Sequence, residues 1–173
     1  KKAGTFDWFG LGGESHIKFK ADDEDNLYAT NDGSLRDRNF QSYTGVTGLT
    51  HTYFFNPTAS GKLTLAVSQT QSDYTEEFID VTKPEKIAFD KQNTQIKYSA
   101  GYTFNKKFNS KNQFTAGAIA DLNKLKLRND YIPRGDSVLT RFMDTKENAA
   151  LIRAFGNFNH RFTDKLYTNI GLY

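Results

Sequence analysis

The 173-residue sequence contains no cysteine, so disulfide bonds and thiolate metal sites are excluded. It also contains no stretch near the roughly 18 consecutive apolar residues that a membrane-spanning helix needs. Hydrophobic residues make up only 37% of the chain, and the mean hydropathy is −0.67. Helical membrane spanning is therefore excluded. Spanning by amphipathic strands remains open, because only alternate residues of a barrel wall face lipid.

Concentrated charge and recognisable catalytic motifs are lacking as well. The net charge is only +3, and lysines and arginines are scattered among acids, which argues against a nucleic-acid surface. His16, His51 and His160 stand singly in strand-like segments, without metal or triad spacing. The glycines of 10–13 lie within a strand pattern and do not form a phosphate loop. We therefore expect no enzyme activity, no cofactor and no nucleic-acid partner.

The N-terminus shows no targeting signal. The basic start at Lys1 and Lys2 is not followed by an apolar region or a cleavage site, so no signal peptide is expected. No linker interrupts the chain, and its length suits one domain. We expect residues 1–173 to form a single unit.

What the sequence does contain is strict alternation of apolar and polar residues. Between Thr94 and Asn105 every second residue is Ile, Tyr, Ala or Phe, and the residues between them are mostly polar. A helix would place successive members of this series about 200° apart, whereas a strand places them all on one face. The same pattern predicts strands at 61–71, 113–123, 149–162 and 166–172, and noisier versions predict strands at 5–19 and 40–55.

The predicted connections alternate between short and long. Short turns are expected at 56–61, 105–112 and 163–165, and long polar loops at 20–38, 79–93 and 129–147. Short turns at one end of a sheet and long loops at the other are typical of outer-membrane barrels. The sequence therefore predicts an all-β fold, an antiparallel up-and-down meander of about seven long strands that is part of a transmembrane β-barrel. An interfacial aromatic girdle is expected beside the short turns, from Tyr53, Phe54, Phe55, Tyr102, Phe104, Phe162 and Tyr167.

Three segments resemble the barrels of TonB-dependent outer-membrane receptors, especially those of Bacteroidetes-type bacteria. They are Gly45-Val46-Thr47-Gly48-Leu49-Thr50-His51-Thr52-Tyr53-Phe54-Phe55-Asn56, Gly61-Lys62-Leu63-Thr64-Leu65-Ala66 and Phe162-Thr163-Asp164-Lys165-Leu166-Tyr167. The resemblance lies in strand and turn texture along nearly the whole chain, and no catalytic motif takes part in it.

This resemblance implies a role in nutrient uptake across the bacterial outer membrane. Receptors of the family combine a plug with a large barrel, and nothing like a plug is recognisable here, so a barrel segment is implied. Its implied partners are outer-membrane lipid, the rest of the barrel and the plug, TonB, and an unidentified nutrient ligand. The odd strand number and the ending at Tyr173 point to truncation within a larger barrel.

Ligand contacts are expected from the long loops, because their aromatic and arginine side chains can stack on or hydrogen-bond to a ligand. The candidates are Tyr28, Arg36, Arg38, Tyr131 and Arg134. Ordinary solvation is the competing interpretation for each. The acidic run Asp22, Asp23, Glu24 and Asp25 could hold calcium, although it lacks the glycine and the final glutamate of an EF-hand.

Two other interpretations of the pattern remain. One is a complete eight-stranded outer-membrane barrel with an adhesion or structural role, whose eighth strand would lie within 129–147. The apolar residues there are Val138, Leu139, Phe142 and Met143. The other is a soluble β-barrel or sandwich that binds a small ligand, with the apolar stripe pointing inward.

Overall fold

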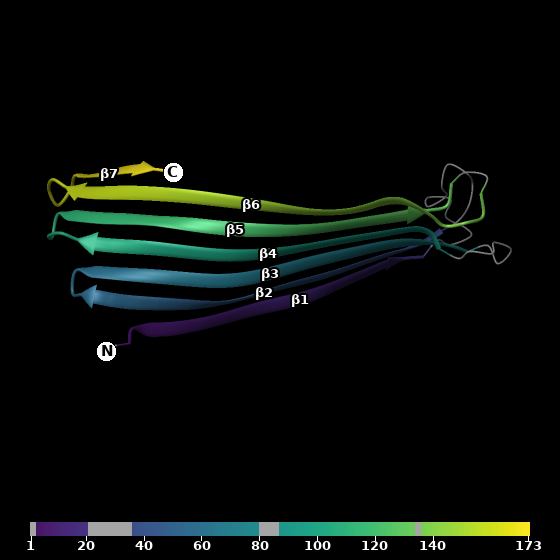
Figure 1. Cartoon of the computed structure of the whole chain (residues 1–173), viewed down its shortest axis with the longest axis horizontal. Helices are drawn as coiled ribbons and strands as arrows, with labels where there is room; N and C mark the ends of the chain where they lie inside the picture. Colours follow the sequence, from purple (N-terminus) through teal and green to yellow (C-terminus); the bar gives the residue numbers. More distant parts are fainter. Residues whose placement is uncertain (1–2, 21–35, 80–86, 134–135) are drawn as a thin grey trace.

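The computed structural model describes residues 3–20, 36–79, 87–133 and 136–173, and these form seven antiparallel strands in one open sheet (Figure 1). The strands lie in chain order, so each is hydrogen-bonded to its neighbours in the sequence. This confirms the predicted all-β, up-and-down meander. No helix of the described part is long and apolar enough to cross a membrane. The strands are β1 (Thr5–Phe19), β2 (Arg36–Asn56), β3 (Ala59–Phe78), β4 (Ile87–Lys107), β5 (Asn112–Tyr131), β6 (Thr140–Arg161) and β7 (Tyr167–Leu172).

Most strands are longer than the sequence pattern predicted. β1 has the predicted bounds, but β4 begins at Ile87 and β5 continues to Tyr131. The long loops expected at 79–93 and 129–147 are therefore partly strand, and their predicted extent was wrong. The reason is that stretches of these outer parts, at 90–93 and 128–130, carry polar side chains on both faces. Alternation is lost there, although the backbone ladder continues.

The three tight turns lie together at one end of the sheet (Figure 1). A side chain closes each of them. Asn56 Oδ1 accepts hydrogen bonds from the backbone N–H and the hydroxyl of Thr58, at 3.0 and 2.9 Å. Asn109 Oδ1 and Thr163 Oγ1 accept backbone N–H groups in the same way in the other two turns. These local bonds explain why the turn positions could be predicted from sequence.

No separate eighth strand lies in the described part of 129–147. This segment supplies the end of β5, a connection that contains Val138 and Leu139, and the start of β6. Phe142 and Met143 belong to β6, beside a register shift between Asn129 and Asp130. The location proposed for an eighth strand was therefore wrong.

The sheet is a single layer without a hydrophobic core of its own. Among the described residues, Ala59 and Ala88 are the buried hydrophobic ones. Large apolar side chains are exposed instead, with Trp8 at 75% and Ile152 at 78% of their full accessibility. A sheet with this much uncovered apolar surface is expected to need a covering environment.

The register defines two faces, because directly paired residues point to the same side. Trp8, Leu49, Leu65, Ala100, Ala120 and Ile152 form one continuous row across β1 to β6. We call this side the Trp8 face. The opposite side contains Asp121 in the adjacent row and is called the Asp121 face.

On the Asp121 face, aromatic rings cover glycines of the neighbouring strand. Gly48 pairs with Phe9, and Gly117 pairs with Phe155. A Cβ at Gly117 would lie 2.6 Å from the Phe155 ring and 2.6 Å from the Tyr102 carbonyl oxygen. Only glycine leaves room for the ring to lie against the backbone, an arrangement that protects strand glycines from solvent.

Gly117→Ala is expected to lower the free energy of unfolding by about 1–3 kcal/mol, because the added methyl group forces the Phe155 ring or the backbone to move. The matched control is Gly156→Ala, because nothing lies within 4 Å of a Cβ at Gly156. Urea unfolding of the refolded chain in detergent measures both. Equal stability of the two variants would contradict this interpretation.

Candidate functional site

An apolar band crosses the Trp8 face next to the tight turns. It consists of successive rows of residues that are paired across the strands. Most positions in these rows hold aliphatic, aromatic or small side chains. Going outward from the turns, the band includes Phe114 and Phe158, then Tyr53, Phe104 and Ala116, then Phe6, Leu63, Tyr102 and Ala154, then the row of Trp8, and finally Val67, Tyr98, Leu122 and Ala150.

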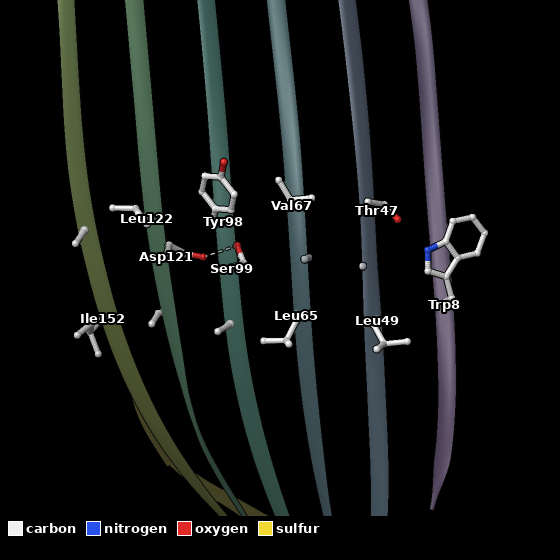
Figure 2. Close-up of a pocket in the computed structure, with 15 residues that line it drawn as sticks. Trp8, Thr47, Leu49, Leu65, Val67, Tyr98, Ser99, Asp121, Leu122 and Ile152 are labelled. Atoms are coloured by element: carbon white, nitrogen blue, oxygen red, sulfur yellow. Dashed lines mark hydrogen bonds between the residues drawn. The ribbon is translucent and has the colours of Figure 1, made fainter.

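A shallow apolar depression lies in the outer part of this band, at its last two rows. Figure 2 shows Trp8 and Ile152 at its two sides, on β1 and β6, with Leu49 and Leu65 between them. Its volume is about 740 Å³. Small residues, including Ala100, form its floor. The depression has the shape and chemistry for hydrocarbon rather than for a polar substrate.

The Asp121 face carries a charged cluster at the same depth. The Asp121 side chain is 3% exposed and accepts hydrogen bonds from Ser99 Oγ at 2.7 Å and from Arg153 Nη2 at 2.6 Å. Lys97 Nζ lies 3.4 Å from the same carboxylate. Lys97 and Arg153 occupy the rows on either side of Asp121 and reach it diagonally. At this level the Trp8 face is apolar, whereas the Asp121 face carries the charged cluster on β4 to β6 together with apolar residues such as Phe9 and Leu151.

The predicted ligand residues Arg36 and Arg38 lie in β2, and Tyr131 lies in β5, so their assignment to loops was wrong. These residues lie in strands because the backbone pairing of β2 with β3, and of β5 with β4, continues beyond the apolar band towards the long connections. The Nη1 of Arg36 lies 3.1 Å from Glu76 Oε2, and the Nε of Arg38 lies 3.5 Å from Glu76 Oε1.

Arg38, Glu76 and Tyr131 belong to one row of the Asp121 face, which also includes Phe89. The structure therefore brings two predicted arginines together around Glu76. It places Tyr131 on the same face, two strands away from Glu76. The remaining candidates lie outside the described residues. They are Tyr28, Arg134, Asp22, Asp23, Glu24 and Asp25.

Glu76 also holds Tyr74, a residue that sequence reasoning did not select. The Tyr74 hydroxyl donates a hydrogen bond to Glu76 Oε1 at 2.6 Å, and its ring meets Phe89 edge-on at 5.9 Å. Burial, together with this hydrogen bond to a carboxylate, raises the pKa of Tyr74 to about 12. The far end of the Asp121 face thus presents aromatic rings beside arginines whose positions are fixed by Glu76.

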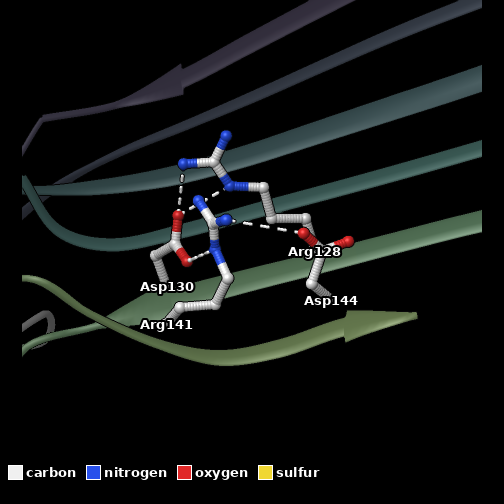
Figure 3. A network of polar contacts seen from close by, with 4 residues as sticks. All are labelled: Arg128, Asp130, Arg141 and Asp144. Atoms are coloured by element: carbon white, nitrogen blue, oxygen red, sulfur yellow. Dashed lines mark hydrogen bonds and ion pairs between the residues drawn. The ribbon is translucent and has the colours of Figure 1, made fainter.

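A second charged network lies on the Trp8 face beyond the apolar band (Figure 3). The Asp130 carboxylate accepts hydrogen bonds from Arg141 Nε at 3.0 Å and from Arg128 Nε at 2.7 Å. Arg141 also lies 3.4 Å from Asp144. The hydrogen bond from Arg141 lowers the pKa of Asp130, burial opposes this shift, and Arg128 adds to the lowering. Sequence reasoning missed this network, because the register shift beside Asp130 decides which residue of β6 faces it.

The lowered pKa of Asp130 predicts a dependence of stability on pH. The contribution is fully present above the unfolded-state pKa of about 3.9 and is lost as the pH falls through the lower pKa of the folded state. Urea midpoints measured from pH 6 down to pH 3 should therefore fall more steeply for the natural chain than for Asp130→Asn. Asp164→Asn, at an exposed carboxylate, should retain the natural slope. Parallel curves for all three proteins would refute this assignment.

The histidines occupy separate places in the sheet. His16 Nε2 lies 2.5 Å from Asn39 Oδ1, and His160 Nδ1 lies 2.6 Å from Asn112 Oδ1. His51 stacks on Phe6, with 4.2 Å between ring centroids. Within the described ranges, no three His, Asp or Glu side chains gather closely enough to hold a metal ion.

Comparison with known proteins adds no family assignment. No protein-family model, curated protein or solved structure matches this chain. The resemblance to TonB-dependent receptors therefore stays a prediction, and function has to be argued from the sheet itself.

Proposed function

We propose that this chain is a section of the wall of a bacterial outer-membrane β-barrel of the TonB-dependent receptor type, which takes part in nutrient uptake. The apolar band of the Trp8 face carries the proposal. It crosses β1 to β6 at one level, and the opposite face at that level contains the Asp121 cluster. A membrane β-barrel has this pattern, with an apolar outer surface and a polar interior.

The height of the band supports this proposal. From Phe114 to Leu122 along β5 the band covers about 27 Å of strand, or about 21 Å in height at a tilt near 40°. The side chains at its two edges extend this towards the roughly 25 Å apolar band of outer-membrane barrels. Since β2 to β6 have 20 to 22 residues each, their outer halves would project beyond the membrane on the side of the long connections.

Aromatic side chains mark the lower edge of the band, as an interfacial girdle would. Tyr53 and Phe55 meet edge-on with 5.2 Å between ring centroids, and Phe55 lies 6.1 Å from Phe104. Phe114 and Phe158 form a direct cross-strand pair at the same level. Of the predicted girdle, Phe162 and Tyr167 lie at the last tight turn and are exposed.

The sheet edges supply a further argument. β1 has no strand on its outer side among the described residues, and β7 pairs only with the part of β6 from Gly156 to Arg161. Long unpaired edges invite further strands. In the proposed assembly the additional strands come from the rest of the barrel. The Asp121 face lines the passage that holds the plug and admits the nutrient, and TonB supplies the energy. Arg36, Arg38 and Tyr131 would then lie inside the outer mouth.

The test uses Trp8, the single tryptophan of the chain. The full chain is refolded with vesicles of phosphatidylcholine whose acyl chains carry bromine, a contact quencher of tryptophan. Strong quenching relative to unbrominated vesicles is expected, because Trp8 lies within the apolar band, one row from its outer edge. An unquenched Trp8, in a chain that stays monodisperse without detergent, would reject the membrane wall and favour a soluble ligand-binding β-protein.

A further inference from the structure

Three lysines form a compact basic patch on the Trp8 face. Lys126 and Lys146 are directly paired across β5 and β6. Lys124 lies two residues before Lys126 in β5 and therefore points to the same face. We call these residues the lysine patch. Side chains of directly paired residues lie about 5 Å apart, and like charges in such pairs are destabilising. The arrangement therefore costs stability unless an anion compensates it.

The acids nearest to the lysine patch are already engaged. Asp130 is bound by Arg128 and Arg141, and Asp144 lies 3.4 Å from Arg141. The ion pairs among the described residues include none for the three lysines of the patch. All three lysines are exposed. The positive charge of the patch is therefore available to an external anion.

The patch is local to β5 and β6. The corresponding positions of β1 to β4 are Gly12, Gly45, Gln69 and Ile96 in the row of Lys124, and Glu14, Tyr43, Gln71 and Thr94 in the row of Lys126. No basic residue occurs among them. At the outer edge of the apolar band, the positive charge in these two rows is therefore confined to β5 and β6.

The patch directly continues the apolar band. Lys124 follows Leu122 on the same face of β5, and its ammonium group lies 5.5 Å from the centroid of the Tyr98 ring. Leu122, Tyr98 and Ala150 line the depression. Positive charge thus caps an apolar trough, an arrangement that matches an amphiphile with an anionic head and hydrocarbon tails.

We propose that the lysine patch and the adjoining depression bind a lipid whose phosphate headgroup carries a net negative charge. The phosphate lies between Lys124, Lys126 and Lys146, and the acyl chains lie along the trough beside Leu122 and Ala150. The inference rests on the proposed membrane wall, because it places this edge of the band at the headgroup level. A free anion would use the lysines alone and would leave the apolar trough unexplained.

The experiment moves the fluorescent reporter next to the patch. The full chain with Trp8→Phe and Leu122→Trp is refolded in phosphatidylcholine vesicles that contain a small fraction of brominated phosphatidylglycerol or, separately, brominated phosphatidylcholine. The relative quenching gives the preference for the anionic lipid near position 122. We expect a preference of about fivefold or more, since one basic side chain near an anionic surface contributes roughly this factor.

The preference should disappear in Lys124→Gln/Lys126→Gln/Lys146→Gln. It should persist in Lys107→Gln/Lys111→Gln/Lys165→Gln, which removes the same charge at the tight-turn end. Quenching by brominated phosphatidylcholine verifies that each variant is inserted. Equal quenching by both lipids, or a preference that survives loss of the patch, would overturn the lipid site and leave the membrane wall standing. Absence of quenching by either lipid would instead count against the wall.

Discussion

Ile152→Arg is expected to lower the free energy of unfolding in vesicles by about 1–3 kcal/mol, because an arginine on a lipid-facing barrel surface costs about 2–4 kcal/mol at the midplane and less towards either interface. Ile152 is 78% exposed and lies in the row of Trp8, the fourth of the five rows of the apolar band counted from the tight turns. Because Ile152 is largely exposed in the sheet, the longer arginine side chain has room on the protein side, and the expected loss comes from its environment. The measurement is a urea or guanidinium titration of the refolded chain.

Leu151→Arg is the matched control. Leu151 is the preceding residue and is 50% exposed, but it points to the Asp121 face, where it pairs with Asp121. An arginine there remains beside water and a carboxylate, so its cost should stay below about 1 kcal/mol. If both substitutions are tolerated equally, the two faces do not differ in environment, and the membrane wall is rejected.

Asp121→Ala is expected to destabilise the chain by about 2–3 kcal/mol, because the nearly buried carboxylate holds charge-assisted hydrogen bonds from two strands. The carboxylate accepts hydrogen bonds from Ser99 and Arg153, and the Lys97 ammonium group lies close to it. Since Lys97 and Arg153 are themselves partly exposed, they can be rehydrated after the loss, which keeps the effect below that of breaking a fully buried ion pair.

A double-mutant cycle with Arg153→Met separates this interaction from other effects of the substitution. The coupling between Asp121 and Arg153 should be clearly larger than that between Asp164 and Arg161, an ion pair at 2.7 Å whose carboxylate is 95% exposed. Exposed pairs contribute about 0–1 kcal/mol. A coupling of the same size in both cycles would mean that the Asp121 cluster adds no more than surface charge does.

The sites depend on register in a way that the sequence does not display. Lys126 and Lys146 are 20 positions apart, and Asp121 and Arg153 are 32 positions apart. Nothing local to any of these residues indicates its partner. The shift between Asn129 and Asp130 then places Arg141, rather than Phe142, opposite Asp130. A difference of one residue would have exchanged the faces and removed this network.

The candidate ligand residues illustrate the same division. Residue type singled out Arg36, Arg38 and Tyr131 as candidate ligand contacts, but the sequence pattern placed them in loops, whereas they lie in β2 and β5. Alternation fades where both faces of a strand meet water, so the boundary between strand and loop left no trace in the sequence. Glu76, which orients the two arginines, had no distinguishing feature at all before the pairing of β2 with β3 was known.

The sequence by itself determined the amphipathic strands, their order and the tight turns. Alternation between Thr94 and Asn105 and the Asn- and Thr-closed turns are local features, stabilised by bonds between residues a few positions apart. Only the tertiary structure decided how far the strands extend, at which level the apolar band ends, and which charges meet at Asp121, Asp130 and the lysine patch. These properties depend on hydrogen bonds between strands, and such bonds join residues that are distant in the chain.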